Sequence, residues 1–368
     1  MTKATSNKMA KATTSKKAKA TRNKKAKATR NKKEFERWLP VRFIFRPAGS
    51  WVLWMDFGTQ ELTDPFFNQQ VNRLQRRRRP MRKTTIAEFL DVAKLFPPAS
   101  PSGYICHVSR CGSTLLANAM KAGGRSTVFS EAQPLYQLLN RDDFPGAGLE
   151  GEEITAVRRK LLDAFLGLYA ASFANPVVVK GHTIDIMQVD KLRAIWPEMP
   201  IMISIRHPAE VIASNLEKSG DWINSILSPF GEKTLFGVAG PHFRQMSIEE
   251  YAVRGLKKLY DGAYRHLDSR TNVLDYNDLN AETARALGQH FGLPELAPDD
   301  PELLRVFSEY SKNPRKSFEP DRERKHRELT DSANQFIERF ALPAYTRLLH
   351  PRACQAASDT RFPMKRAT

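Results

Sequence analysis

Mostly apolar runs alternate with amphipathic stretches along residues 104–291, and this alternation predicts a parallel β-sheet. Runs of strand length occur at residues 104–109, 127–130, 176–182, 200–206 and 272–276. Stretches with the helical period of apolar positions occur at residues 114–121, 154–173, 187–196, 208–217 and 281–291. Apolar strands that alternate with helices are typical of a parallel sheet covered on both faces. We therefore predict the α/β class, with a parallel β-sheet flanked by helices and a small N-terminal extension.

The residues before this alternation have a different pattern. Residues 38–72 contain the short apolar runs FIF, WVLWM and DPFF, which indicate strands or an aromatic-rich cover. Thr85 and Glu88 have the spacing of a helix N-cap, and the breaker-rich PPASPSG at 97–103 is typical of a linker. These boundaries predict four parts, which are listed here in chain order: a disordered basic tail at 1–33, an N-terminal extension packing on the core at 34–100, the α/β domain at 101–350, and a C-terminal tail at 351–368.

Most of the positive charge lies at the N-terminus. The net charge is +18, and residues 1–33 hold 11 Lys and 2 Arg with no acidic residue, which is 13 of those 18 charges. The segment KAKATRNK occurs at 17–24 and again at 25–32, with almost no aliphatic residue beyond alanine. Such a segment cannot bury a core and is expected to be disordered. It is either a solvated tail or a non-specific contact for polyanions such as nucleic acid.

No apolar stretch of about 18 residues occurs, so no transmembrane segment is expected. The N-terminus lacks the apolar core of a signal peptide. The cysteines, Cys106, Cys111 and Cys354, have neither disulfide nor zinc spacing. An odd number of cysteines indicates a reducing compartment, and a cytoplasmic location is expected.

Residues 107–120, HVSRCGSTLLANAM, have the composition of an anion-binding loop between a strand and a helix. Backbone N–H groups at a helix N-terminus bind anions, and glycine lets the backbone come close to them. An ATP- or GTP-binding loop would carry lysine where Gly112 stands. Here the cation is Arg110, which precedes the glycine. The sequence therefore predicts a loop built for another kind of phosphate.

Three segments resemble one family, the sulfotransferases that use 3′-phosphoadenosine-5′-phosphosulfate (PAPS). SRCGSTLL resembles the family's 5′-phosphosulfate loop. ISIRHPAEVIASNL, residues 203–216, resembles its 3′-phosphate segment, in which a serine stands eight residues after an arginine. VLDYNDLNAETARALGQHFGLP, residues 273–294, resembles a later strand, turn and helix of the family. The resemblance covers about residues 104–295 and implies a P-loop NTPase-like fold of the sulfotransferase type.

The resemblance implies a transferase that moves a sulfuryl group from PAPS to a hydroxyl or amine acceptor without a metal. The residues that it implies for the 5′-phosphosulfate are Arg110, Cys111, Gly112, Ser113 and Thr114. Arg206 and Ser214 would bind the 3′-phosphate. The family's C-terminal Arg-Lys-Gly…Gly-Asp-Trp loop is absent, and the basic residues Lys312, Arg315 and Lys316 are candidates for the nucleotide lid.

Two residues compete for the role of general base. VVVKGH resembles a segment in which Lys180 would be the transition-state cation and His182 the base. VFSEAQPL resembles a segment of the bacterial and tyrosylprotein-type members, in which Glu131 would be the base. Either side chain could instead be structural, and the loop places Glu131 marginally ahead. His107 and His207 are interpreted as structural.

Two other functions stay open. A P-loop kinase or NTPase is one, although the loop lysine and an obvious magnesium-binding aspartate at a strand end are absent. A non-catalytic nucleotide- or nucleic-acid-binding protein is the other, and only the basic tail supports it. The acceptor is not defined by the sequence. The aromatic residues that could line an apolar acceptor site, or else belong to the core, are Trp51, Trp54, Phe66, Phe67, Trp222 and Phe230.

Overall fold

The computed structural model describes residues 35–59, 62–149, 151–218, 246–309 and 329–350, together with Lys33 and Ile223. The predicted tails, except for Lys33, and the candidate lid residues Lys312, Arg315 and Lys316 lie outside these ranges. Trp222 and Phe230 lie outside them as well. Among the residues described, no helix has the length and apolar character that crossing a membrane requires.

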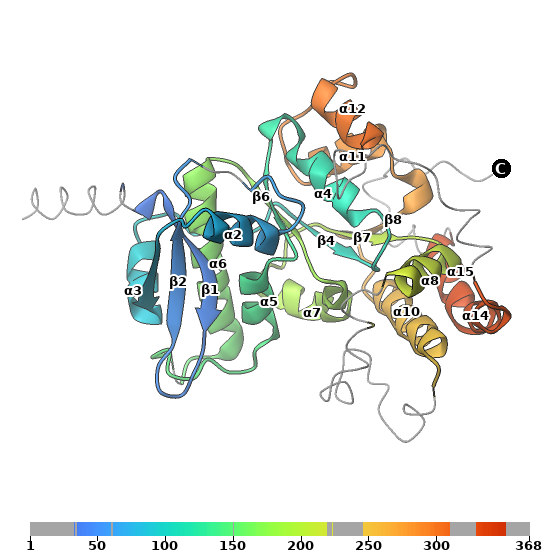
Figure 1. Ribbon diagram of the computed structural model, residues 1–368, viewed down its shortest axis with the longest axis horizontal. Coiled ribbons are helices and arrows are strands. Elements are labelled where there is room, and N and C mark those ends of the chain that lie inside the picture. Colours follow the sequence, from blue (N-terminus) through green and yellow to red (C-terminus); the bar gives the residue numbers. More distant parts are fainter. Residues whose placement is uncertain are drawn as a thin grey trace, which may run out of the picture.

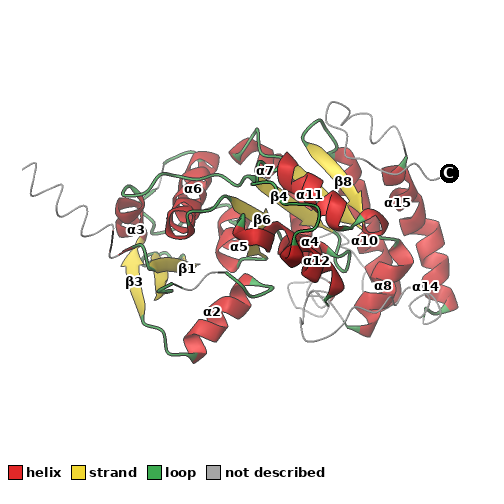
Figure 2. Ribbon diagram, turned by 90° about the horizontal axis from the view of Figure 1, so that it is seen from above, coloured by secondary structure: helices red, strands yellow, loops and turns green. Residues whose placement is uncertain are grey.

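A five-stranded parallel sheet forms the centre of the fold, with the strand order β5-β6-β4-β7-β8. Its strands are β4 (Gly103–His107), β5 (Thr127–Ser130), β6 (Val177–Lys180), β7 (Ile201–Ile205) and β8 (Thr271–Asp275). Helices α4 (Ser113–Lys121), α11 (Ala281–His290) and α12 (Pro301–Ser308) cover one face. Helices α6 (Ile154–Phe173), α7 (Val189–Ile195) and α10 (Ile248–Arg265) cover the other (Figures 1 and 2). The predicted parallel sheet flanked by helices is confirmed.

Successive residues of each strand point to opposite faces of the sheet, and both sets are buried. One hydrophobic cluster contains Ile105, Val128 and Met202 with residues of α4 and α11. The other contains Cys106 and Phe129, next in sequence, with residues of α6 and α10. This two-sided burial explains why the strands read as nearly continuous apolar runs.

A second sheet, antiparallel and three-stranded, lies beside the first and precedes it in the chain. It consists of β1 (Trp38–Ile44), β2 (Trp51–Asp56) and β3 (Met81–Thr85). Helix α2 (Phe67–Arg76) connects β2 to β3, and α3 (Ile86–Ala93) follows β3. The sheet packs on α6, where Tyr169 Oη donates a hydrogen bond of 2.9 Å to the Pro40 carbonyl. Trp54 and Phe67 belong to this core rather than to an open acceptor site.

The predicted helix start at Thr85 is confirmed as a capping box. Thr85 Oγ1 accepts from the Glu88 N–H at 3.2 Å, and Glu88 Oε2 accepts from the Thr85 N–H at 2.8 Å. The predicted helix at 187–196 begins instead as a 3₁₀ segment, Thr183–Gln188, which leads into α7. The sequence analysis did not predict α2, β3 or α5 (Gln133–Asn140).

Helix α8 (Pro208–Glu217) follows β7. It lies against a C-terminal group formed by α10, α14 (Asp331–Phe336), the π-helical turn Ile337–Ala341 and α15 (Leu342–Leu349). Tyr345 of α15 donates a hydrogen bond of 2.6 Å to Asp275 Oδ2 at the end of β8. This group therefore supports the sheet on the side of β7 and β8, next to the carboxyl ends of the strands.

Candidate functional site

The loop between β4 and α4 has an unusual backbone. Arg110 has a φ of +62° and Gly112 a φ of +79°, while Cys111 between them is not left-handed. Non-glycine residues rarely adopt positive φ, and such residues cluster at functional sites. Helix α4 begins at Ser113 directly after Gly112. The first N–H groups of a helix have no acceptor within it, so the loop presents an anion site at the end of β4.

Helix α8 and strand β7 hold this loop in place. Ser204 Oγ donates to the Cys111 carbonyl at 3.1 Å, and Arg206 Nη1 donates to the Arg110 carbonyl at 3.3 Å. Ser109 Oγ donates to Asn215 Oδ1 at 3.2 Å. The carbonyls of the loop are therefore bound on the β7 side by Ser204 and Arg206, and Ser109 is bound to Asn215 of α8. Of these partners, the sequence pattern predicts a role only for Arg206. A serine inside the otherwise apolar strand IMISI is the signal that could have identified Ser204.

Gly112 has no room for a side chain. A Cβ there would lie 2.7 Å from a ring carbon of Tyr276 and 3.0 Å from Leu279. Gly112→Ala is therefore expected to lower the free energy of unfolding by more than the roughly 1–2 kcal/mol that a left-handed alanine costs. Gly124 is a matched control, because its φ is +64° and nothing lies within 4 Å of the added Cβ. Denaturant unfolding of both variants tests this expectation, and equal losses would contradict it.

The side chains of Lys180, Glu131 and His107 meet at the ends of β4, β5 and β6. Lys180, the last residue of β6, donates its ammonium to Glu131 Oε1. His107, the last residue of β4, has Nε2 3.5 Å from the same oxygen and 3.0 Å from the Gly181 carbonyl. Glu131 follows β5 with a φ of +49°, and its N–H donates to the Lys180 carbonyl at 2.8 Å. His107 therefore belongs to this cluster, and its contacts are compatible with the structural role that the sequence predicts for it.

The charges of this cluster are strongly coupled. Burial would raise the pKa of Glu131, but the adjacent Lys180 and His107 outweigh it and hold that pKa well below its usual range. Burial and Lys180 would lower the pKa of His107, yet its contacts with the Cys111 thiol and Glu131 raise it overall. Glu131 is therefore an ionised carboxylate, with 29% of its side chain exposed beside an ammonium that is 1% exposed.

His182 lies next to this cluster in a different state. Its backbone N–H donates to Asp185 Oδ2 at 2.7 Å, and its ring packs on Tyr136 with the centroids 4.7 Å apart. Within the described part of the chain, His182 Nε2 is buried without a hydrogen-bond partner. Burial lowers its pKa, although Asp185 and Glu131 oppose this. His182 is therefore neutral near pH 7, with a nitrogen free to accept or donate.

Arg206 and Arg110 are both engaged within the protein. Arg206 Nε donates to Glu210 Oε2 at 2.6 Å, and the guanidinium carbon lies 4.1 Å from the ring centroid of Tyr276. Arg110 Nη2 donates to the Lys218 carbonyl at 2.7 Å. Glu210, which is 2% exposed, lies on α8 four residues before Ser214 and hence on the same helical face. A 3′-phosphate at Arg206 would compete with the Glu210 carboxylate, which already contacts Nε and Nη2 of the guanidinium.

The structure therefore gathers the predicted residues into two groups at one edge of the sheet. Arg110, Gly112 and Arg206 meet at the loop, and Glu131, Lys180 and His182 lie at the ends of β5 and β6. His107 connects the groups, because it contacts both Glu131 and the Cys111 thiol. Among the described residues, no cluster of three or more His, Cys, Asp or Glu side chains could hold a metal ion.

No protein-family model matches the chain, and no curated protein matches it. Solved structures that resemble it include a sulfotransferase from Alicyclobacillus acidocaldarius, with 16% identity over 71% of this chain and 98% of that chain and a TM-score of 0.37. Sulfotransferase STF9 from Mycobacterium avium has 9% identity over 69% and 80% of the two chains, with a TM-score of 0.42. The sulfotransferase domain from the curacin biosynthetic pathway has 18% identity over 70% and 97%, with a TM-score of 0.36. At these identities and TM-scores the likeness carries no argument about function, and the chain is simply similar in structure to sulfotransferases.

Proposed function

We propose that this protein is a PAPS-dependent sulfotransferase that moves a sulfuryl group to a hydroxyl or amine acceptor. The observation that carries the proposal is the Lys180–Glu131 pair at the strand edge that also holds the anion-binding loop. Transfer of a compact anionic group needs a site for the leaving anion, a cation near the transferred group and a base for the acceptor. The loop, Lys180 and Glu131 supply these parts, and the resemblance of the loop sequence favours sulfuryl transfer.

The loop residues fit a 5′-phosphosulfate. Gly112 offers backbone without a side chain, and Ser113 and Thr114 form the first turn of α4, where N–H groups point out of the helix. Arg110 adds a guanidinium whose Nε is buried without a partner among the described residues. When bound, PAPS supplies a sulfuryl group on a phosphate leaving group. Arg110 and the loop would hold that phosphate.

Glu131 is the base that we propose, and Lys180 sets its strength. Lys180 lowers the pKa of Glu131, so a carboxylate paired with this ammonium is a weak base. An ammonium that turns from Glu131 toward an anion held in the loop would stabilise that anion. The same movement would remove the nearest cation from Glu131, raise its pKa and strengthen it as a base. The pair would thereby activate the base only when the donor site is filled.

His182 is the alternative base. Its unpartnered Nε2 and its lowered pKa give it the neutral form that can accept a proton. It competes with Glu131 for this role because both side chains lie at the ends of neighbouring strands. The two assignments predict a different dependence of turnover on pH.

Calorimetric titration of arginine variants tests whether Arg206 binds the 3′-phosphate and Arg110 the 5′-phosphate. Arg206→Gln is expected to weaken the binding of adenosine 3′,5′-bisphosphate by about 10- to 150-fold, which corresponds to roughly 1.5–3 kcal/mol for a charged hydrogen bond. The affinity for AMP should not change. Arg110→Ala should weaken both ligands alike. Glu210→Gln should tighten the bisphosphate severalfold, because it removes the carboxylate that holds Arg206.

The double variant Arg206→Gln/Glu210→Gln is the folding control, since Arg206→Gln alone leaves a buried carboxylate without its cation. The competing outcome is an equal loss of AMP and bisphosphate binding in Arg206→Gln. That result would mean that Arg206 acts only through the Arg110 carbonyl, and the 3′-phosphate assignment would be wrong.

A further inference from the structure

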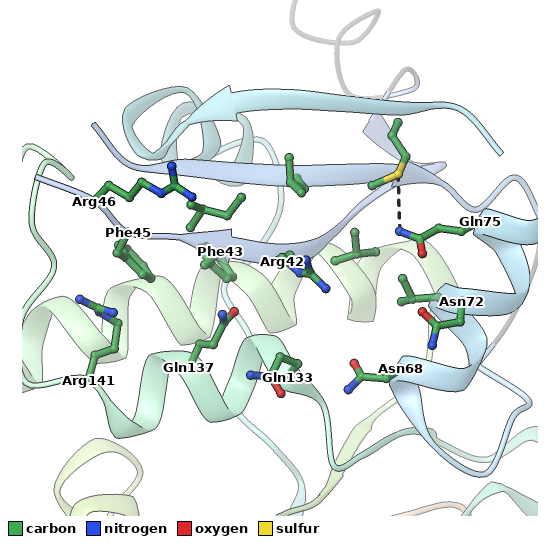
Figure 3. Close-up of a pocket in the computed structure, with 15 residues that line it drawn as sticks. Arg42, Phe43, Phe45, Arg46, Asn68, Asn72, Gln75, Gln133, Gln137 and Arg141 are labelled. Atoms are coloured by element: carbon green, nitrogen blue, oxygen red, sulfur yellow. Dashed lines mark hydrogen bonds between the residues drawn. The ribbon is translucent and has the colours of Figure 1, made fainter. Parts of the chain in front are cut away.

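A cavity of about 590 Å³ lies between β1, α2 and α5 (Figure 3). Its wall is rich in carboxamides, which are contributed by Asn68, Asn72, Gln75, Gln133 and Gln137. On α2 these side chains are spaced by four and three residues, and on α5 by four, so each helix presents one polar stripe to the cavity. Because a carboxamide both donates and accepts hydrogen bonds, stripes on both walls can bind a ligand with many hydroxyl groups.

The cavity is also positively charged. Arg42, Arg46 and Arg141 line it, and the described residues that line it include no aspartate or glutamate. Arg141 forms an ion pair with Asp143, whereas neither Arg42 nor Arg46 has an ion-pair partner within the described residues. The ring of Phe45 lies 4.9 Å from the guanidinium of Arg141, at the same end as Arg46 (Figure 3). That end therefore offers cations and an aromatic face.

The opposite end of the cavity adjoins the proposed catalytic pair. Gln133, the first residue of α5, follows Glu131 by two positions. The ring of Phe66, which precedes α2, lies 4.9 Å from the ammonium of Lys180, and Asn68 of the same helix lines the cavity. Lys180 and Glu131 are not among the residues that line the cavity, but Asn68 and Gln133 of its two helical walls follow Phe66 and Glu131 by two positions each. A ligand in the cavity would extend from the base past Arg42, which lies near Gln133, toward Arg46 and Arg141 (Figure 3).

One polar group in this wall lacks a partner. Gln137 Oε1 is buried and has no hydrogen-bond partner among the described residues. Burying a carboxamide oxygen without a partner costs free energy, and a hydroxyl of a ligand would satisfy it. In Figure 3 the Gln137 side chain points from α5 into the cavity toward β1. This is the position in which a ligand lying between α5 and the strand would meet it.

We propose that this cavity binds the acceptor and that the acceptor is an acidic oligosaccharide. The inference rests on the proposed function, because it uses Glu131 as the base that meets the acceptor hydroxyl. The carboxamide stripes would bind the sugar hydroxyls, and Arg42 and Arg46 would bind a carboxylate, sulfate or phosphate group. From Gln133 to Arg141 the helical rise is about 12 Å, which suits more than one sugar ring. The basic N-terminal tail is not needed for this recognition.

The test is calorimetric binding of two probes to the full chain at physiological salt: a hyaluronan tetrasaccharide, which is acidic, and cellotetraose, which is neutral. The acidic probe should bind at least about tenfold more tightly. Arg42→Gln and Arg46→Gln should each lower the affinity for the acidic probe by roughly three- to tenfold and leave the affinity for the neutral probe unchanged. Gln137→Leu should weaken both probes, because it removes a hydroxyl contact.

Arg305→Gln is the matched control, since this arginine of α12 is 53% exposed and pairs with Glu309 away from the cavity. It removes one positive charge and should change neither affinity. Binding through the basic tail alone would persist in every variant, which would overturn the inference. Equal affinity of the two probes, no binding of either at millimolar concentration, or tighter binding after Gln137→Leu would overturn it as well.

The same protein preparations should be titrated with adenosine 3′,5′-bisphosphate. If the bisphosphate binds and neither tetrasaccharide does, the acceptor assignment fails while the proposed function stands. If the acidic tetrasaccharide binds as expected and the bisphosphate does not, the sulfotransferase proposal fails and the cavity is a saccharide site of another function.

Discussion

Replacing Glu131 with glutamine is expected to lower turnover by about 10²–10⁴-fold, the range for loss of a general base. The glutamine keeps the size of the side chain and an oxygen that can accept from Lys180, so the donor site should stay formed. The affinity for adenosine 3′,5′-bisphosphate should therefore change little. Single-turnover sulfuryl transfer to a fixed acceptor, with calorimetry on the same protein, measures both quantities.

His182→Asn is the matched variant, because it removes the competing base from the neighbouring strand end. With Glu131 as the base, His182→Asn should keep turnover within about tenfold of the wild type. A large loss in His182→Asn with little loss in Glu131→Gln would exchange the two roles. Wild-type turnover in both variants would exclude both residues as the general base, and the proposed catalytic site would be wrong.

The dependence of turnover on pH separates the same two assignments without mutation. In the unliganded protein the pKa of Glu131 lies well below its usual range, so the carboxylate is ionised throughout pH 5–8. Turnover measured well below KM reports the unliganded protein and should therefore show no acid limb in that range. Burial lowers the pKa of His182, and its neutral form is the base. With His182 as the base, turnover would fall as the pH drops through that lowered pKa, which lies below about 6.5. A profile with this acid limb would contradict the Glu131 assignment.

Lys180→Met is expected to lower turnover by about 10²–10³-fold, the loss seen when one preorganised group is removed from the charge that develops in a transition state. Methionine fills a similar volume in a position that is 1% exposed and leaves Glu131 with access to solvent. The variant should therefore fold. The pKa of Glu131 should rise, because its principal cation is gone.

The free energy of unfolding of single and double variants tests whether Glu131 and Lys180 are coupled as a buried ion pair. Glu131→Gln leaves the Lys180 ammonium buried without a counter-charge, and such losses reach about 3–5 kcal/mol when both groups are fully buried. The loss here should be smaller, because Glu131 is partly exposed. The double variant Glu131→Gln/Lys180→Met should recover stability relative to Glu131→Gln. Losses that simply add would contradict a coupled pair.

The central sheet could be predicted because its strands are buried on both faces. Val177, Val178 and Val179 are each nearly inaccessible, and a run of such residues between breakers has few other interpretations. Helix α6 was predicted at its observed bounds, since apolar positions recur through its whole length. The strand ends followed from these runs, which is why Lys180 and Arg206 could be named as candidates.

Other parts of the fold depend on contacts that a local pattern does not contain. Strand β3, MRKTT, is polar and exists because it pairs with β2. Helix α2 is short, its apolar face consists only of Phe67, Val71 and Leu74, and no side-chain cap at Phe66 marks its start. Helix α5 is short and begins with Gln133 and a proline. These three elements build two walls of the cavity and the sheet beside it, so the proposed acceptor site was beyond the sequence analysis.

The residues at the strand ends could be predicted from the sequence, but the contacts between their side chains could not. The sequence placed Glu131 and Lys180 after neighbouring strands without showing that they form an ion pair. It did not indicate that Glu210 holds Arg206, because a glutamate on the first turn of a helix usually interacts with the helix dipole. The contact of His107 with Glu131 depends on the pairing of both β4 and β5 with β6, which a local pattern does not contain.

Calorimetric titration of the full chain with adenosine 3′,5′-bisphosphate, AMP and ATP with Mg²⁺ tests the sulfotransferase proposal most directly. The loop lacks the phosphate-binding lysine, and we propose a second phosphate site at Arg206 and Ser214. The bisphosphate should therefore bind most tightly, and a chelator should leave its affinity unchanged. The bisphosphate should also raise the melting temperature more than the other two ligands at equal concentration. Tighter binding of ATP with Mg²⁺, lost on addition of the chelator, would contradict the proposal.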